Sequence, residues 1–211
     1  LVCWDNSSHE EALVRVGDCD VLIVNKIKVD KALLDAAPKL RLVCEAATGI
    51  NNIDVDECSA RGIIVRNVAG YSTYSVVQAT FGHILSLLGN MPYFDNAVKS
   101  GRYSSSGLFT DVSRPFTEIH GKRLGIIGMG NIGSHVALVA KAFGMEVSYY
   151  STSGTGHCHD YPSVALDTLM RESDVISIHA PYNERTAGLI GYNELAMMKP
   201  TAIIVNMGRG G

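Results

Sequence analysis

The chain has 211 residues, of which 46% are hydrophobic and 18% are charged, and its formal net charge is −3. This length is sufficient for one large domain or two small ones. Acidic and basic residues are interspersed, and without a basic run we expect neither a nucleic acid nor an anionic membrane surface as a partner. No apolar stretch is long enough to cross a bilayer, so the sequence does not predict a membrane protein.

The chain start and the cysteines indicate the compartment. Leu1 is not an initiating Met, and no signal peptide follows it, so we expect the natural N-terminus to be missing or processed. The five cysteines are odd in number and contain no CxxC pair, which argues against a disulfide framework and a zinc ribbon. The tripeptide His157-Cys158-His159 lacks a third ligand at a suitable spacing. We therefore expect a cytoplasmic protein without a metal site.

The first third alternates short apolar runs with short helices. Strand-like runs occupy 21–24, 40–44 and 63–65. Two helices are expected between these strands. Asp30 is placed to cap the first, and Asp54 the second, with Glu57 as the capping-box partner of Asp54. This βαβ order predicts an α/β domain.

A long helix and a loop-like excursion follow. Apolar side chains at helical spacing predict a buried stripe on the helix, formed by Val77, Phe81, Ile84, Leu85 and Leu88. Residues 100–118 show no clean period and are rich in turn formers. Leu108, Phe109 and Phe116 interrupt this polarity, so we interpret the segment as a connecting excursion and not as a disordered linker.

The second half is more regular. Strand-like runs occupy 124–127, 146–150, 174–179 and 202–206. We expect helices between them, one with Ile132 and Val136 on its apolar face, one capped by Ser163, and one over 193–198. This order predicts a doubly wound parallel sheet of the Rossmann type.

A glycine motif separates the first of these strands from its helix. Gly128 permits the tight turn, Gly130 lets the backbone approach a pyrophosphate, and Gly133 allows close packing of the helix on the sheet. The N-terminus of the helix then offers free N–H groups to the phosphates. The motif alone is weak evidence, but its position between a buried strand and an amphipathic helix favours a dinucleotide site.

The end of the next strand lacks the acid that often holds the adenosine ribose. Ser151 stands at that position. Nothing there repels a 2′-phosphate, and no Arg or Lys follows to attract one. The sequence therefore leaves NAD and NADP both open.

Several further motifs occur in a characteristic order. They are 47–54 (ATGINNID), 67–73 (NVAGYST), His179-Ala180-Pro181 with Thr186, and 205–211 (VNMGRGG). With the glycine motif, they resemble the D-isomer-specific 2-hydroxyacid dehydrogenase family, most closely its glycerate dehydrogenase (hydroxypyruvate reductase) branch. The resemblance covers essentially the whole chain.

The resemblance implies a two-domain architecture. Residues 1–73 correspond to part of a flavodoxin-like substrate domain, and residues 74–211 to part of the dinucleotide-binding domain. The helix over 77–88 is expected to serve a homodimer. The sheet is expected to be incomplete at its C-terminal end.

The resemblance also implies site residues. Arg209 is the expected catalytic residue, because a guanidinium clamps a carboxylate and polarises the adjacent carbonyl. Backbone N–H groups of Thr48 and Gly49 are expected to receive the substrate carboxylate, with Tyr71 over the same pocket. The expected cofactor contacts are Asn131 and Ile132 at the pyrophosphate, Ala180, Pro181 and Thr186 around adenosine and ribose, and Met207, Gly208 and Arg209 near the nicotinamide.

The general acid of the family, a His paired with a Glu, lies downstream of the Arg motif. This sequence ends at Gly211, so we expect these 211 residues alone not to turn over substrate. His179 is expected to be a wall residue of the cofactor site and not the acid.

We therefore predict an NAD(P)-dependent oxidoreductase that interconverts a small 2-oxo acid and its D-2-hydroxy acid. Hydroxypyruvate and glyoxylate are the first candidate substrates by resemblance. The alternative is a non-catalytic dinucleotide-sensing protein, because the same fold also serves as a corepressor scaffold.

Overall fold

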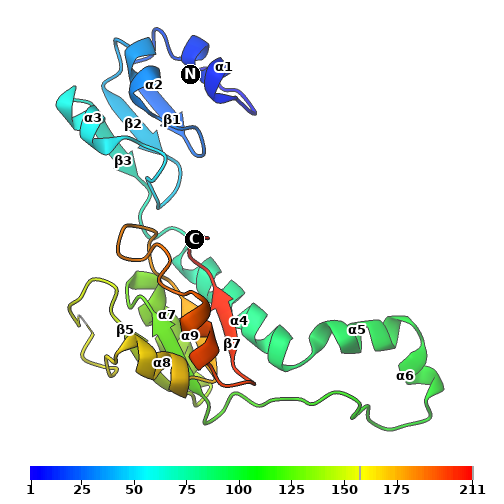
Figure 1. The fold of residues 1–211 in the computed structure, drawn as a ribbon. Coiled ribbons are helices and arrows are strands. Elements are labelled where there is room, and N and C mark those ends of the chain that lie inside the picture. The colour runs from blue at the N-terminus through cyan, green and yellow to red at the C-terminus, as the bar shows by residue number, and fades with distance from the viewer. Residues whose placement is uncertain (157, 211) are drawn as a thin grey trace. The chain divides into compact units, whose positions relative to one another are not determined.

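The computed structural model describes residues 1–156 and 158–210 (Figure 1). The chain divides into two compact units, Leu1–Tyr71 and Ser72–Gly211. Each unit has its own parallel sheet and its own apolar core.

The first unit is a three-stranded parallel sheet with helices in the connections. Its elements are α1 (His9–Arg15), β1 (Val21–Val24), α2 (Lys31–Ala36), β2 (Leu42–Glu45), α3 (Val55–Ala60) and β3 (Ile64–Asn67), with strand order β1-β2-β3. The three expected strands are confirmed, with boundaries shifted by up to two residues. Helix α1 was not expected, although Ser8 and Glu11 form a reciprocal capping box, which is a sequence signal of a helix N-terminus.

The start of α3 corrects one expectation. Asp54 caps the helix, accepting a hydrogen bond from the backbone N–H of Glu57 at 2.9 Å. The Asp54 N–H donates to the carbonyl of Val29 at 2.8 Å, so it is not available to the Glu57 carboxylate. Glu57 pairs with Arg61 one turn later, at 2.6 Å. The capping-box prediction for this helix is therefore wrong.

The second unit is built on a four-stranded parallel sheet. Its strands are β4 (Arg123–Ile127), β5 (Glu146–Tyr150), β6 (Val175–Ile178) and β7 (Ile203–Asn206), in the order β5-β4-β6-β7. Ile127 is in register with Tyr150 on one side and with Ile178 on the other. Because the strands end level, their following loops gather at one edge. The predicted doubly wound parallel sheet is confirmed.

Helices cover both faces of this sheet. Helices α4 (Thr73–Leu88) and α7 (Asn131–Ala142) pack on one face, and α8 (Leu166–Glu172) and α9 (Tyr192–Met197) pack on the other. Alternation along β4 divides the cores, because Ile126 faces α7 and Ile127 faces α8. The expected stripe on α4 is buried at Val77, Phe81 and Ile84, whereas Leu85 is 38% exposed.

One cap in this unit differs from expectation. Ala165 is the N-cap residue of α8, and it makes no side-chain cap. Ser163 instead forms a parallel β-bridge with Tyr149, beside β5. The prediction that Ser163 caps this helix is wrong because its backbone continues the sheet for one residue before the helix begins.

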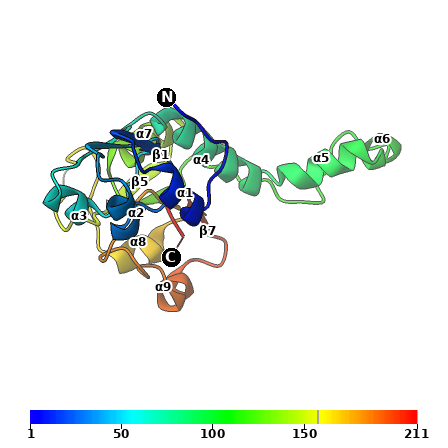
Figure 2. The same ribbon diagram turned by 90° about the horizontal axis from the view of Figure 1, so that it is seen from above.

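An arm follows α4. It consists of α5 (Met91–Lys99), α6 (Arg102–Ser105) and the chain that returns to β4, and it extends away from the sheet in both views (Figures 1 and 2). The excursion expected over 100–118 is present, but α5 was not expected. In the part of the chain that the structure describes, no helix is long and apolar enough to cross a membrane.

Candidate functional site

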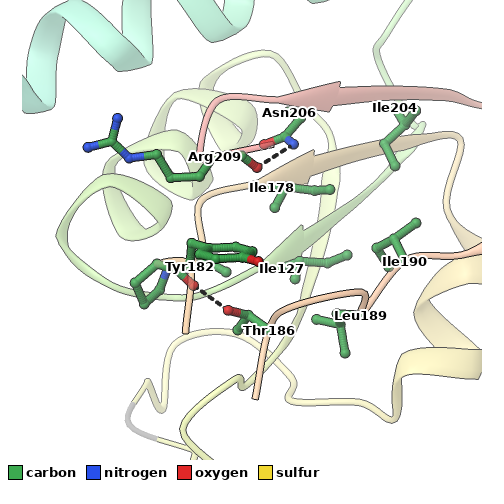
Figure 3. A pocket seen from close by; sticks show the side chains of 11 residues that line it. Ile127, Ile178, Tyr182, Thr186, Leu189, Ile190, Ile204, Asn206 and Arg209 are labelled. Atoms are coloured by element: carbon green, nitrogen blue, oxygen red, sulfur yellow. Dashed lines mark hydrogen bonds between the residues drawn. The ribbon is translucent and has the colours of Figure 1, made fainter. Parts of the chain in front are cut away.

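The candidate site lies in the second unit, at the carboxyl edge of its sheet. The strand order reverses direction between β4 and β6, since the chain runs outward from β4 to β5 and then returns to the other side of β4. In open α/β sheets, ligands bind at this switch point, in the crevice beyond the strand ends. The loops after β4, β6 and β7 meet there (Figure 3).

The three motif glycines have three different surroundings. Gly128 has φ +94°, and a Cβ there would lie 2.9 Å from the backbone nitrogen of Ala180. A Cβ on Gly133 would overlap the carbonyl oxygen of Gly128. A Cβ on Gly130 would meet nothing within 4 Å. The protein's own packing thus requires glycine at positions 128 and 133, whereas Gly130 borders open space at the N-terminus of α7.

Helix α7 points its N-terminus at this space. Gly130 is the N-cap residue and supplies no side-chain cap. The N–H groups of residues 131–133 precede the first intrahelical donor, because Ser134 donates to Gly130 at 2.9 Å. These N–H groups and the helix dipole fit the phosphates of a dinucleotide.

The Asn131 side chain is engaged within the protein. Its Nδ2 donates to Oγ1 of Thr73 at 2.7 Å, at the start of α4. Asn131 therefore offers a ligand its backbone, while its side chain ties α7 to α4. Ile132 is half-buried and packs against the core on this face.

A pocket of about 270 Å³ opens at the same edge (Figure 3). Most of the side chains that line it are apolar, and they come from strand ends and from the loops after β6 and β7. Its lining comprises Ile127, Ile178, Ala180, Pro181, Tyr182, Thr186, Leu189, Ile190, Ile204, Asn206 and Arg209. The structure thus brings four of the predicted site residues together on one pocket: Ala180, Pro181, Thr186 and Arg209. An apolar pocket with a few polar groups is typical of a small-molecule or cofactor site.

Thr186 shapes this pocket from within the loop after β6. Its Oγ1 donates to the carbonyl of Pro181 at 2.5 Å and accepts from the N–H of Asn183 at 2.9 Å. The Thr186 residue is only 9% exposed. Its hydroxyl therefore closes the turn from Pro181 to Thr186, so its contribution to the site is the shape of the wall.

The loop after β7 presents Arg209 through a turn that sequence reasoning missed. Asn206 Oδ1 accepts from the N–H of Gly208 at 2.9 Å, and Asn206 Nδ2 donates to the carbonyl of Arg209 at 3.0 Å. A Cβ on Gly208 would lie 2.9 Å from the carbonyl oxygen of Ala180. Met207 is half-buried against the core. The Arg209 guanidinium extends away from the isoleucines toward the pocket rim (Figure 3).

His179 lies at the end of β6. Burial lowers its pKa to about 4, so the imidazole is neutral near pH 7. Its Nε2 lies 2.8 Å from Oγ of Ser177, and its Nδ1 is buried without a partner among the described residues. A neutral, half-buried imidazole that contacts a serine is a poor proton donor near pH 7, and His179 is not among the residues that line the pocket.

The loop after β5 contains Ser151. Its Oγ donates to the carbonyl of Thr155 at 2.6 Å, which folds the loop back on itself. Arg185, from the loop after β6, donates through Nη1 to the carbonyl of Ser153 at 3.1 Å. A cation thus reaches the Ser151 loop from a distant part of the sequence, which no spacing rule along 149–153 reveals.

In the first unit, Thr48 and Gly49, which are predicted to bind substrate, lie in a loop after β2 that side chains fix in place. Oγ1 of Thr48 donates to the carbonyl of Val68 at 3.2 Å, and Asn67 Nδ2 donates to the carbonyl of Thr48 at 2.6 Å. Gly49 is half-buried, and Tyr71 is 63% exposed.

A partly buried hydrogen bond between Asn52 and Glu45 supports this loop, and sequence reasoning missed it. Glu45 is 1% exposed, and its Oε2 accepts from Nδ2 of Asn52 at 2.8 Å. Asn52 also donates to the carbonyl of Ile27 at 2.9 Å, which joins this loop to the loop after β1. The sequence signal for this contact was Glu45 itself, a charged residue at the end of a strand, because buried charged residues usually have a polar partner.

Metal ligands were not expected. Within residues 1–156 and 158–210, no group of three or more His, Cys, Asp or Glu side chains is arranged to hold a metal ion. The tripeptide 157–159 includes His157, which lies outside the described residues, as does Gly211 of the last motif.

Comparison with known proteins shows the family. Residues 81–211 match the NAD binding domain of D-isomer specific 2-hydroxyacid dehydrogenases. The chain therefore belongs to this family, and the resemblance drawn from its motifs is confirmed. It spans 60–65% of the length of the first four curated relatives that it matches.

Individual relatives are similar over almost the whole chain. The hydroxypyruvate reductase of Thermotoga maritima is 36% identical over 100% of this chain and 67% of its own. A D-lactate dehydrogenase of Aquifex aeolicus, solved with NAD and lactic acid, is 31% identical with a TM-score of 0.84, covering 94% of this chain and 59% of that one. An acyclic imino acid reductase solved with NADPH and D-Arg is 29% identical with a TM-score of 0.88, covering 98% and 65%.

Proposed function

We propose that the protein is an NAD(P)-dependent oxidoreductase that interconverts a small 2-oxo acid and its D-2-hydroxy acid. The observation that carries this proposal is the open space at Gly130, at the N-terminus of α7, on the same sheet edge as the pocket that Arg209 lines. A bound nicotinamide supplies or accepts the hydride. The names of the relatives favour this enzyme over a non-catalytic dinucleotide sensor.

In this proposal Arg209 is the catalytic residue. Its planar guanidinium forms two parallel hydrogen bonds with a carboxylate and polarises the neighbouring carbonyl oxygen, toward which charge moves during hydride transfer. The Asn206 turn limits the freedom of the Arg209 backbone, which lowers the entropy lost when substrate binds.

The substrate class we propose is a small 2-oxo acid, with hydroxypyruvate and glyoxylate first. The loop at Thr48 and Gly49 supplies backbone N–H groups for the substrate carboxylate, and Tyr71 supplies an aromatic wall. Support comes from the hydrogen bonds that hold Thr48 in place and from the hydroxypyruvate reductase relative.

We assign the cofactor as NAD or NADP, held by the second unit. The N–H groups of Asn131, Ile132 and Gly133 bind the pyrophosphate, and Gly128 and Gly130 allow its approach. Ala180, Pro181 and Thr186 form the wall for adenosine and ribose, with Ser151 at the ribose hydroxyls. Met207, Gly208 and Arg209 border the nicotinamide.

We propose that a second copy of the chain covers the arm formed by α5, α6 and the returning segment. Several of its large apolar side chains are more than half exposed: Met91, Val98, Leu108, Phe109, Val112 and Phe116. Large exposed apolar side chains that gather on one segment often mark an interaction surface. Leu85 and Leu87 of α4, the helix that precedes the arm, are exposed as well, and we propose that the second copy forms the homodimer expected from the sequence.

A reducing compartment is consistent with all five cysteines being free thiols. We therefore propose a cytoplasmic location.

The direct test is an assay of the purified natural protein with hydroxypyruvate and with glyoxylate, each with NADH and with NADPH. We expect oxidation of the reduced cofactor, and the product from hydroxypyruvate should be the D enantiomer by chiral chromatography. L-glycerate as the product, or no turnover of any 2-oxo acid by a protein that binds the cofactor, would contradict the proposal.

A further inference from the structure

Arg185 connects the two loops that flank the glycine motif. It lies in the loop after β6, and its Nη1 donates to the carbonyl of Ser153, in the loop after β5, at 3.1 Å. Strand β4 lies between β5 and β6 in the sheet. The side chain therefore brings a positive charge to the loop at the end of β5, where the adenosine ribose of a bound dinucleotide lies in this fold.

In the part of the chain that the structure describes, Arg185 makes no ion pair. Among the described residues, no Asp or Glu lies within ion-pair distance of Arg185. The position after β5 that often carries a ribose-binding acid is Ser151, and the next acid along the chain is Asp160. The loop after β5 thus lacks the acid that would repel a phosphate, and the Arg185 guanidinium lies beside it.

The donors of Arg185 are only partly used. A guanidinium has five N–H donors in a planar fork, and the bond to Ser153 uses one of them. The residue is exposed, so its remaining donors point into solvent-accessible space at the edge of the site. A planar fork of this kind matches a phosphate and gives short, charge-assisted hydrogen bonds.

We propose that Arg185 is a specificity-determining residue that binds the 2′-phosphate of NADP, so that the site prefers NADP(H) to NAD(H). The inference rests on the proposed function, since it presumes a dinucleotide along this edge. The Ser153 carbonyl holds the guanidinium at the end of β5, and Ser151 in place of an acid leaves the phosphate unopposed. The loop after β6 thereby takes over a task usually performed by residues that directly follow β5.

The test measures binding of adenosine fragments, which needs no turnover. Isothermal titration calorimetry on the full chain compares adenosine 2′,5′-bisphosphate with adenosine 5′-monophosphate, each checked by competition with ADP-ribose. We expect the bisphosphate to bind roughly tenfold more tightly or better, because one or two charge-assisted hydrogen bonds are gained. In R185Q this preference should disappear, while the affinity for the monophosphate stays within about twofold.

Two further variants separate charge from structure. R185K keeps the charge without the fork and should retain only part of the preference. R171Q removes another exposed arginine, in the last turn of α8, and should leave both affinities unchanged. Thermal unfolding of all variants verifies that each is folded, and raising the salt concentration should weaken the preference in the wild type.

The outcomes separate the two proposals. Equal affinity of the wild type for both adenosine ligands, or an unchanged preference in R185Q, would overturn the role of Arg185 and leave the dinucleotide site standing. Failure of ADP-ribose and both adenosine ligands to bind the wild type would overturn the proposed function and this inference with it.

Discussion

Asn206 and Arg209 are joined across a four-residue turn, where the Asn206 side-chain amide donates to the Arg209 carbonyl at 3.0 Å. The same side chain accepts from the N–H of Gly208 at 2.9 Å. One asparagine at the end of β7 therefore folds the backbone that carries the proposed catalytic guanidinium. Asn is suited to this position because its short side chain closes turns with its own neighbouring backbone.

The first prediction concerns Arg209 in the natural protein. R209K keeps the positive charge but loses the fork that clamps a carboxylate, so kcat/KM for the 2-oxo acid should fall by roughly 100-fold or more. Cofactor affinity, measured by fluorescence titration of NAD(P)H, should change by less than about threefold. Wild-type kinetics in R209K would remove Arg209 from the mechanism. R171K is the matched control, because this exposed arginine lies on α8, outside the pocket.

The second prediction concerns stability against pH. His179 has a pKa of about 4 in the folded protein, against 6.5 in the unfolded chain, because burial disfavours its charged form. Between these pH values the unfolded state binds more protons, so the free energy of unfolding should fall as the pH drops from 6.5 toward 4. The free energy of unfolding is therefore higher above pH 6.5 than below pH 4, and His179 accounts for roughly 3 kcal/mol of this difference at most.

Urea unfolding at a series of pH values measures this slope. In H179Q the side chain cannot be protonated, so the dependence between pH 6.5 and 4 should become flatter than in the wild type. Parallel profiles for the two proteins would show that His179 is accessible to protons in the folded state.

The third prediction concerns Ser151. S151D places a carboxylate where it accepts from the ribose hydroxyls and repels a 2′-phosphate. The ratio of kcat/KM for NADPH to that for NADH should therefore fall by roughly tenfold or more. S151N, of similar size but neutral, should change the ratio much less. If S151D leaves the ratio unaltered, Ser151 does not face the ribose.

The strands and the glycine motif could be predicted because their signals are local. Continuous apolar runs mark β4 and β7, and the turn at Gly128 needs a positive φ that glycine supplies. Ser163 and Glu57 show where local rules fail, since their capping roles are lost to a β-bridge and to the hydrogen bond from Asp54 to Val29.

The contacts that complete the site are non-local. Arg185 reaches Ser153 across 32 positions of sequence, and Asn131 bonds to Thr73 across 58. No periodicity or spacing along the chain encodes such pairs, because they depend on how strands are ordered in the sheet. The turn at Asn206 is local, but it could not be predicted because asparagine and glycine occur together in many ordinary loops.

The central claim, that this sheet edge holds a nicotinamide dinucleotide at Gly130, has one most direct test. Titration of NADH and NADPH into the wild-type chain and G130A is read by calorimetry, with thermal unfolding in parallel. Because a Cβ at Gly130 meets nothing within 4 Å, G130A should lose less than about 1 kcal/mol of stability. Its Cβ should still block the pyrophosphate and weaken dinucleotide binding at least roughly tenfold. Binding of both dinucleotides by G130A as tightly as by the wild type, or by neither protein, would contradict the account.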